Sequence, residues 1–149
     1  MFRDRRYTWD EVTERTRRLG NYFTSRGLGC HTERSNLAAH ESGQDHLAIY
    51  LHNGNEYLES MLAAFKARVV PFNVNYRYVA EELSYLLDDS RATAIVYHSA
   101  FAETLAAVRE RTPRLSVLIQ VPDESGAPLL DGAVWYEDAL AASSPDRLP

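Results

Sequence analysis

Residues 46–72 read HLAIYLHNGNEYLESMLAAFKARVVPF, and this stretch decides the fold class. The run HLAIYL is short and apolar, as in a buried strand, and Asn53-Gly54 is a turn signal that ends it. Helical spacing of apolar residues follows from Asn55 to Ala67, and Val69–Phe72 is a second short apolar run. The face of this helix that we expect to be apolar carries Tyr57, Leu58, Met61, Leu62 and Phe65. Strand, helix and strand in this order predict a parallel βαβ unit.

The same alternation continues on both sides of this unit. A helix is expected over 9–26, with Thr8 as its N-cap and Gly27 as its C-cap glycine. Downstream we expect a helix over 79–90, a strand over 92–98, a helix through Phe101, Leu105 and Val108 with Ser99 as N-cap, a strand over 116–121, a loop over 122–132 and a short helix over 136–142. The predicted fold class is therefore α/β, a mainly parallel sheet of at least three strands with flanking helices.

Residues 29–45 interrupt the pattern. The sequence GCHTERSNLAAHESGQD has no sustained period and predicts a long surface loop, with one short helical turn near Leu37. Four potential zinc ligands, Cys30, His31, His40 and His46, fall in or beside this loop. Their spacing matches no compact zinc motif, so we favour solvated histidines and a loop cysteine and predict no metal site.

Composition and charge narrow the classes of function. The chain of 149 residues has a net charge of −5, which argues against binding nucleic acid or an anionic membrane surface. No apolar run approaches the ~18 residues that span a bilayer, and the N-terminal residues contain no apolar signal core. A single cysteine excludes an internal disulfide, so a cytoplasmic location is the default expectation.

No catalytic constellation stands out. The seven glycines form neither GxGxxG nor GxxxxGK[ST], so the chain lacks a recognisable phosphate loop. The carboxylate pairs Glu81–Glu82 and Asp88–Asp89 lie at the two ends of a predicted helix and are interpreted as solvated helix ends. His52 and His98 follow predicted strands, but a capping or packing role is favoured over catalysis. We therefore predict no catalytic residue.

The polar turn after the second strand is the candidate binding element. Asn73, Asn75 and Arg77 follow the apolar run VVPF directly. In open parallel sheets ligands bind beyond the carboxyl ends of the strands, which is where this turn is expected. Asparagine side chains also stabilise tight turns by hydrogen bonding to backbone. The geometry alone names no ligand.

Two segments of the sequence resemble a known family. YTWDEV (Tyr7–Val12) resembles the first core motif of the adenylate-forming, or AMP-binding, superfamily, which includes acyl-CoA synthetases, luciferases and peptide-synthetase adenylation domains. HLAIYLHNGNEYLESMLAAFKARVVPFNVNYRY (His46–Tyr78) resembles the second core motif with its flanks, and EELSYLLDDSRATAIVYH continues the match. The ending VNYRY looks most like bacterial fatty-acyl-CoA synthetases, including those acting on long-chain or sterol-side-chain acids. The resemblance covers essentially the whole chain.

The resemblance implies that residues 1–149 are a partial N-terminal subdomain of such a synthetase, with 29–45 as an inserted surface loop. In this family Arg68 replaces the usual glycine of a Lys-Ala-Gly turn. The family's ATP loop, ribose-binding Asp, hinge and adenylation lysine come after this region, and Lys66, the only lysine, belongs to the Lys-Ala-Gly position. The full enzyme would use ATP, Mg²⁺, CoA and a fatty acid, and this chain alone is expected to be inactive and to hold no cofactor.

The resemblance also suggests a role for Arg77. In some members of the family the Arg of this turn contacts a CoA phosphate, so we carry that role over to Arg77. The alternative is that Arg77 pairs with Glu81 one helical turn later. Two other classes of function stay open for the chain: a stand-alone, non-catalytic α/β binding or interaction module, and, ranked last, a flavodoxin-like module, which would lack any phosphate or acidic-site motif.

Overall fold

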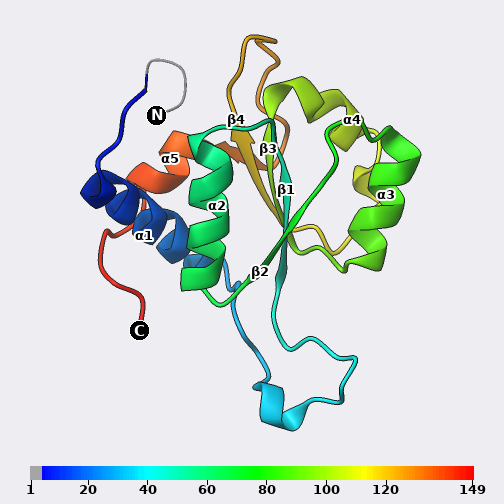
Figure 1. Ribbon diagram of the computed structural model, residues 1–149. Coiled ribbons are helices and arrows are strands. Elements are labelled where there is room, and N and C mark those ends of the chain that lie inside the picture. Colours follow the sequence, from blue (N-terminus) through cyan, green and yellow to red (C-terminus); the bar gives the residue numbers. More distant parts are fainter. Residues whose placement is uncertain (1–4) are drawn as a thin grey trace.

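The protein is an open five-stranded parallel sheet with helices on both faces, as Figure 1 shows for the computed structural model. The structure describes residues 5–149. The predicted subdomain over 1–149 and the predicted absence of a signal core therefore include residues 1–4, which lie outside the described residues. The strand order is β2-β1-β3-β4-β5, and every neighbouring pair is parallel. The strands are β1 (His46–Tyr50), β2 (Val70–Asn73), β3 (Ala94–His98), β4 (Val117–Val121) and β5 (Ala133–Trp135).

The parallel α/β architecture predicted from the sequence is confirmed. The four expected strands, β1 to β4, pair in parallel, with Ile49 opposite Val96 in β3 and opposite Asn73 in β2. The edge strand β5 was not predicted, because it has only three residues and no alternating pattern. The helices are α1 (Trp9–Ser25), α2 (Asn55–Lys66), α3 (Ala80–Asp89), α4 (Ala102–Ala106) and α5 (Tyr136–Ala141), with short 3₁₀ turns η1 (Arg34–Asn36), η2 (Ser99–Phe101) and η3 (Arg109–Arg111).

Two hydrophobic cores lie on opposite faces of the sheet. Side chains alternate along β1, so Leu47 and Ile49 face the core beneath α1, α2 and α5, whereas Ala48 and Tyr50 face the core beneath α3 and α4. Both faces of the central strands are thus covered, as parallel sheets require. The helices cover the two faces of the sheet but not the ends of its strands, so a ligand would bind at the strand ends.

The boundaries of α1 follow its sequence signals. Thr8 is its N-cap and forms a capping box with Glu11, whose carboxylate accepts from the Thr8 backbone N–H at 2.6 Å. These hydrogen bonds from Thr8 to the carboxylate lower the pKa of Glu11. Gly27 takes φ +82°, the left-handed conformation that commonly ends a helix. Both end signals predicted for this helix are confirmed.

The face that α2 buries differs from the predicted one. Leu58 and Phe65 of the predicted apolar face are 48% and 58% exposed, so this face is not the one that the helix buries. The helix instead buries Glu56, Glu59, Ser60, Ala63 and Ala64. The small side chains let α2 approach α1 closely, because a Cβ on Gly20 of α1 would lie 3.3 Å from the carbonyl oxygen of Ala63. Close contact with α1 therefore outweighs the apolar periodicity of α2.

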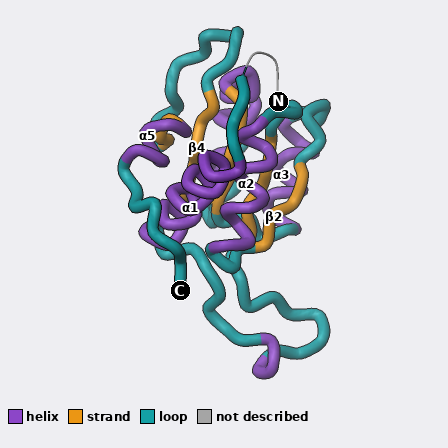
Figure 2. The backbone as a smooth tube through the Cα atoms, turned by 60° about the vertical axis from the view of Figure 1, so that its left-hand side comes forward, coloured by secondary structure: helices purple, strands orange, loops and turns teal. Residues whose placement is uncertain are grey.

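Residues 29–45 form a loop that extends beyond the amino ends of the strands (Figure 2). The expected helical turn is η1. The Glu33 carboxylate accepts two 2.8 Å hydrogen bonds from Arg68, and these bonds lower the pKa of Glu33 and raise that of Arg68. Arg68 has φ +59°, so this residue adopts the left-handed conformation at the position where glycine is usual in the family it resembles. That the loop is an insertion stays a prediction.

Candidate functional site

The turn after β2 is held rigidly at the carboxyl edge of the sheet. Buried Val74 donates its backbone N–H to the carbonyl of Ile49 at 2.9 Å, which continues the β1–β2 ladder into the turn. The Asn75 side chain accepts from the backbone N–H of Arg77 at 3.0 Å, forming an Asx turn, as expected for asparagine here. From the sheet, the Tyr50 hydroxyl donates to the carbonyl of Tyr78 at 3.1 Å. The turn is thus fixed at its start, middle and end.

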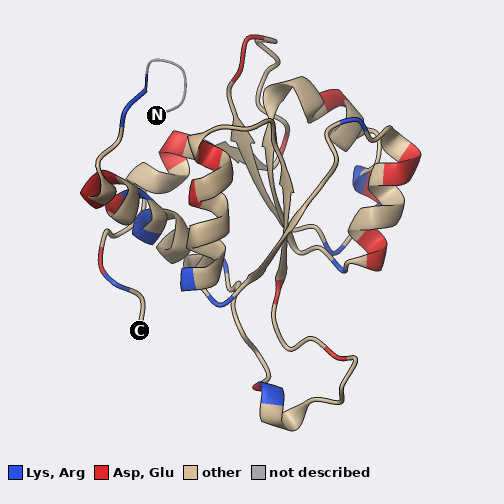
Figure 3. Cartoon of the chain, in the orientation of Figure 1, with Lys and Arg blue, Asp and Glu red and all other residues tan. Residues whose placement is uncertain are grey.

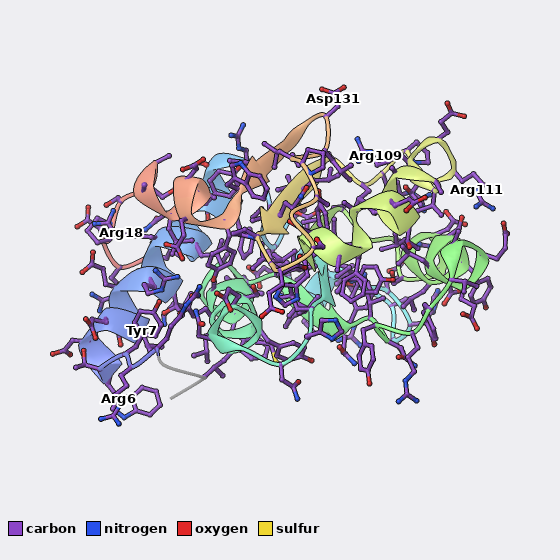
Figure 4. The ribbon with its side chains drawn as sticks, turned by 90° about the horizontal axis from the view of Figure 1, so that it is seen from above. Arg6, Tyr7, Arg18, Arg109, Arg111 and Asp131 are labelled. Carbon is purple, nitrogen blue, oxygen red and sulfur yellow. The ribbon has the colours of Figure 1, made fainter. Side chains whose placement is uncertain are left out.

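Arg77 projects from this turn with its guanidinium over an aromatic ring. The guanidinium carbon lies 5.5 Å from the ring centroid of Tyr76, a cation–π distance. The alternative in which Glu81 pairs with Arg77 is not what the structure shows. The Glu81 carboxylate accepts two hydrogen bonds from Arg111, at 2.9 and 3.0 Å, and Figure 4 shows Arg111 beside α3.

The two histidines at strand ends meet at this edge. The backbone N–H of His52 donates to Nδ1 of His98 at 3.0 Å, so that nitrogen carries a lone pair and the proton of a neutral ring is on Nε2. The His52 ring lies 4.9 Å from that of Tyr76 and 5.0 Å from that of Phe101. His98 thus accepts from a strand-end amide, and His52 packs in an aromatic cluster beside Arg77, contacts of the capping and packing kinds that we favoured for these histidines.

A cleft of about 620 Å³ opens beside this cluster, bounded by residues that follow β1, β3 and β4. At its rim the Arg5 guanidinium donates to the Glu56 carboxylate at 2.7 Å. On the opposite wall Asp123 accepts from the backbone N–H of Ala100 at 2.8 Å and from Ser125. Burial acts to raise the pKa of Asp123, but these hydrogen bonds and nearby His98 outweigh it and lower that pKa. The Asp123 carboxylate and the imidazoles of His52 and His98 therefore line the same cleft.

A buried glutamine shapes the loop on that wall. Gln120 is fully buried in β4; its side-chain oxygen accepts from the Tyr97 hydroxyl at 2.7 Å and from the backbone N–H of Leu130 at 3.0 Å. Its amide nitrogen donates to the Ser99 hydroxyl and to the carbonyl of Pro128. Ser99 thus binds Gln120 and does not form the side-chain N-cap that we predicted. The only sequence signal for this network is a glutamine inside the apolar run SVLIQV.

The remaining chemistry-bearing residues lie away from this edge. Lys66 donates from Nζ to the hydroxyl of Thr16 at 2.8 Å, on the face of the sheet that α1 covers. In the long loop, His31 contacts the Asp45 carboxylate at 2.6 Å, and His46 contacts Ser42 and the carbonyl of Ser90. Within residues 5–149 the structure brings no three His, Cys, Asp or Glu side chains together in a metal-binding group. No helix of that range is long and apolar enough to cross a membrane.

The open parallel sheet with helices on both faces defines the class as an open α/β fold, in which ligands generally bind beyond the carboxyl ends of the strands. The sequence matches the AMP-binding enzyme family over residues 1–147. The chain therefore belongs to the AMP-binding enzyme family, and the resemblance to adenylate-forming enzymes is confirmed.

Two curated relatives of the chain are acyl-CoA ligases. It is 61% identical over 146 residues to the medium-chain acyl-CoA ligase Mig of Mycobacterium avium, covering 98% of this chain and 26% of that protein. It is 35% identical over 144 residues to the 3-oxocholest-4-en-26-oate–CoA ligase of Rhodococcus rhodochrous, covering 96% of this chain and 24% of that one. The chain thus spans about a quarter of the length of the curated relatives it matches.

Solved structures share the fold at low sequence identity. The crystal structure of the anthranilate CoA ligase AuaEII in complex with anthranoyl-AMP superposes with a TM-score of 0.80 at 17% identity, covering 96% of this chain and 24% of that chain. The crystal structure of a Brucella canis acyl-CoA synthetase superposes with a TM-score of 0.74 at 18% identity, covering 95% of this chain and 23% of that chain. At these identities the likeness concerns the fold alone.

Proposed function

We propose that the chain is the N-terminal part of an ATP-dependent fatty-acyl-CoA ligase, with a role in fatty acid metabolism. The complete enzyme would join a fatty acid carboxylate to the α-phosphate of ATP, releasing pyrophosphate. The CoA thiol would then attack the acyl carbon and displace AMP. The observation that carries the proposal is the 61% identity to a medium-chain acyl-CoA ligase over 98% of the chain. Because ATP and CoA are cytoplasmic cosubstrates, we place the enzyme in the cytoplasm.

In this proposal Arg77 is the contribution of the chain to CoA binding. Its guanidinium stands on a turn fixed by three hydrogen bonds and lies against Tyr76, so little rotational freedom is lost on binding an anion. Arginine also suits phosphate geometry, since its planar fork donates two parallel hydrogen bonds. These features support a contact with a CoA phosphate.

The chain alone is expected not to catalyse adenylation. Phosphoryl transfer depends on donors and cations positioned around the phosphates, and the sequence contains neither a glycine-rich phosphate loop nor the adenylation lysine. ATP and Mg²⁺ would be held by the remainder of the ligase. ATP–pyrophosphate exchange by the purified 149-residue chain with a medium-chain fatty acid should therefore match the no-enzyme control. Exchange above that control, from protein free of any complete ligase, would contradict this assignment.

The stand-alone binding module remains the second candidate, and reading the gene separates the two. A complete ligase requires a Thr-Ser-Gly-Thr-Thr-Gly-like phosphate loop encoded within a few dozen codons after Pro149. A stop codon at that point in the natural gene would favour the module, whose binding site would then be the cleft beside His52.

A further inference from the structure

Three basic side chains surround a pocket far from the carboxyl edge. Arg17 on α1, Lys66 at the last turn of α2 and Arg147 in the C-terminal tail line a pocket of about 370 Å³, together with Thr13. Figure 3 shows Lys and Arg positions on α1, at the end of α2 and on the tail, on the side of the sheet that these segments cover. The cluster is distinctive because the whole chain has a net charge of −5.

The tail that supplies Arg147 is fixed against α1. Arg18 donates to the carbonyl of Ser143 at 2.7 Å, and the Asn21 side chain donates to the carbonyls of Ser144 and Asp146, both at 2.9 Å. Leu148 packs so closely on Gly20 that a Cβ there would lie 2.8 Å from its Cδ1. These contacts fix the tail against α1, so Arg147 lines the same pocket as Arg17 and Lys66.

These cations have no acidic partner in the part of the chain that the structure describes. Within residues 5–149 the ion pairs of the structure give none of the three a carboxylate; Glu14 pairs with Arg18, and the Asp146 carboxylate accepts from Ser144. Lys66 donates to the Thr16 hydroxyl, while burial and then the charge of Arg17 lower the pKa of Lys66. Arg17 and Lys66 are both partly buried and repel each other, and an anion between such cations stabilises them.

We propose that the pocket between α1, the end of α2 and the C-terminal tail binds a small phosphoanion through Arg17, Lys66 and Arg147. Thr13 lies in the same lining and would offer its hydroxyl as a neutral donor. Two guanidinium groups and one ammonium give enough charged donors for the oxygens of a phosphate or diphosphate. A single carboxylate would satisfy fewer of them, so the site should prefer phosphate chemistry. This inference does not depend on the proposed ligase activity.

The test is a titration of the chain with inorganic pyrophosphate, followed by ³¹P line broadening and calorimetry. The protein is extended by Gly-Ser-Gly after Pro149, because that residue lines the pocket and its terminal carboxylate would compete. We expect saturable binding that weakens as salt is raised. Arg17→Gln and Lys66→Met should each weaken it about tenfold, since each removes one charge-assisted donor. Acetate at equal ionic strength should bind far more weakly.

Arg114→Gln is the matched control, because this exposed arginine lies near Asp88 on the other face of the sheet. It should leave pyrophosphate binding unchanged. If Lys66→Met disturbs folding through the loss of its bond to Thr16, the exposed Arg147→Gln decides, with about a tenfold loss expected. No binding by the wild type, equal acetate binding, or an equal loss in Arg114→Gln would overturn the proposal. AMP should bind like inorganic phosphate; AMP binding that survives Arg17→Gln would also overturn it.

Discussion

At the residue scale, the question is whether Arg77 binds a ligand or only stabilises the fold. Glu81 forms its ion pair with Arg111 and not with Arg77. The Arg77 guanidinium lies over the exposed ring of Tyr76, at the carboxyl ends of the strands. Among the residues described here it is thus the arginine best placed to meet a ligand from the polar turn after β2. A carboxyl-edge position for this turn could be predicted from the order of apolar runs and turn signals alone.

Arg77→Ala in a ligase that carries this segment should raise the KM for CoA about ten- to a hundredfold. A charge-assisted hydrogen bond contributes about 1.5–3 kcal/mol, and 1.4 kcal/mol is a factor of ten. The adenylation half-reaction should barely change, because CoA enters after it. The two half-reactions are assayed separately, with Arg111→Ala as the neighbouring control. An unchanged KM for CoA would leave Arg77 a structural residue.

Three buried tyrosines predict how stability responds to alkali. Burial raises the pKa of Tyr50, Tyr97 and Tyr136, and Glu59 raises that of Tyr136 further. Above pH ~10 the unfolded chain loses these protons while the folded chain keeps them, so the unfolded state binds fewer protons and stability falls. Below pH ~10 their contribution is fully present. In a titration followed by phenolate absorbance and circular dichroism, about three tyrosines should ionise only as the fold is lost. Ionisation of all nine in a chain that stays folded would contradict this.

At the element scale, one buried carboxylate joins three helices. Glu59 of α2 is 1% exposed; it accepts from Arg15 of α1 at 2.9 Å and 3.1 Å and from the Tyr136 hydroxyl of α5 at 2.8 Å. Arg15 also pairs with exposed Glu137 at 2.7 Å. Hydrogen bonds to both carboxylates raise the pKa of Arg15 despite its burial. The helical layer over the first core therefore depends on a polar network as well as on apolar packing.

Glu59→Ala should lower the free energy of unfolding by about 3–5 kcal/mol, because it leaves the Arg15 charge and the Tyr136 hydroxyl without their buried partner. Glu137→Ala is the matched control: it removes the other, exposed partner of Arg15 and should cost less than about 1 kcal/mol. Urea unfolding with unchanged m-values measures both. Equal costs for the two variants would show that burial of the pair is not what stabilises this layer.

The limits of sequence reasoning are clearest in these elements. Short apolar runs bounded by turn signals identified β1 to β4, whereas the three residues of β5 carry no period. Periodicity grouped Leu58 and Phe65 on one apolar face of α2, but it cannot tell which face of a helix meets a neighbour, and both side chains are exposed. Glu59 is polar by type, so its burial depends on Arg15, which is 44 residues away. The hydrogen bond from His52 to His98 and the hydrogen bonds of Asp123 likewise join residues far apart in sequence.

At the scale of the whole molecule, the chain presents large apolar side chains that its own fold leaves exposed. Trp9, Leu58 and Phe65 are 78%, 48% and 58% exposed on α1 and α2. Trp9 and Leu58 line one apolar hollow of about 380 Å³ between these helices. Surfaces of this kind are typical of contacts with further protein. In the proposed ligase, the other three quarters of the enzyme would supply that contact.

The most direct test of the central claim is a chimaera. The chain replaces the 146 matching residues of the medium-chain acyl-CoA ligase Mig, to which it is 61% identical. If the chain is the same working part of an acyl-CoA ligase, the chimaera should form acyl-CoA from a medium-chain fatty acid with kcat/KM within about tenfold of the parent, or ~1.4 kcal/mol of transition-state stabilisation. A chimaera that folds with the circular dichroism and thermal midpoint of the parent, yet forms no acyl-CoA, would contradict the account.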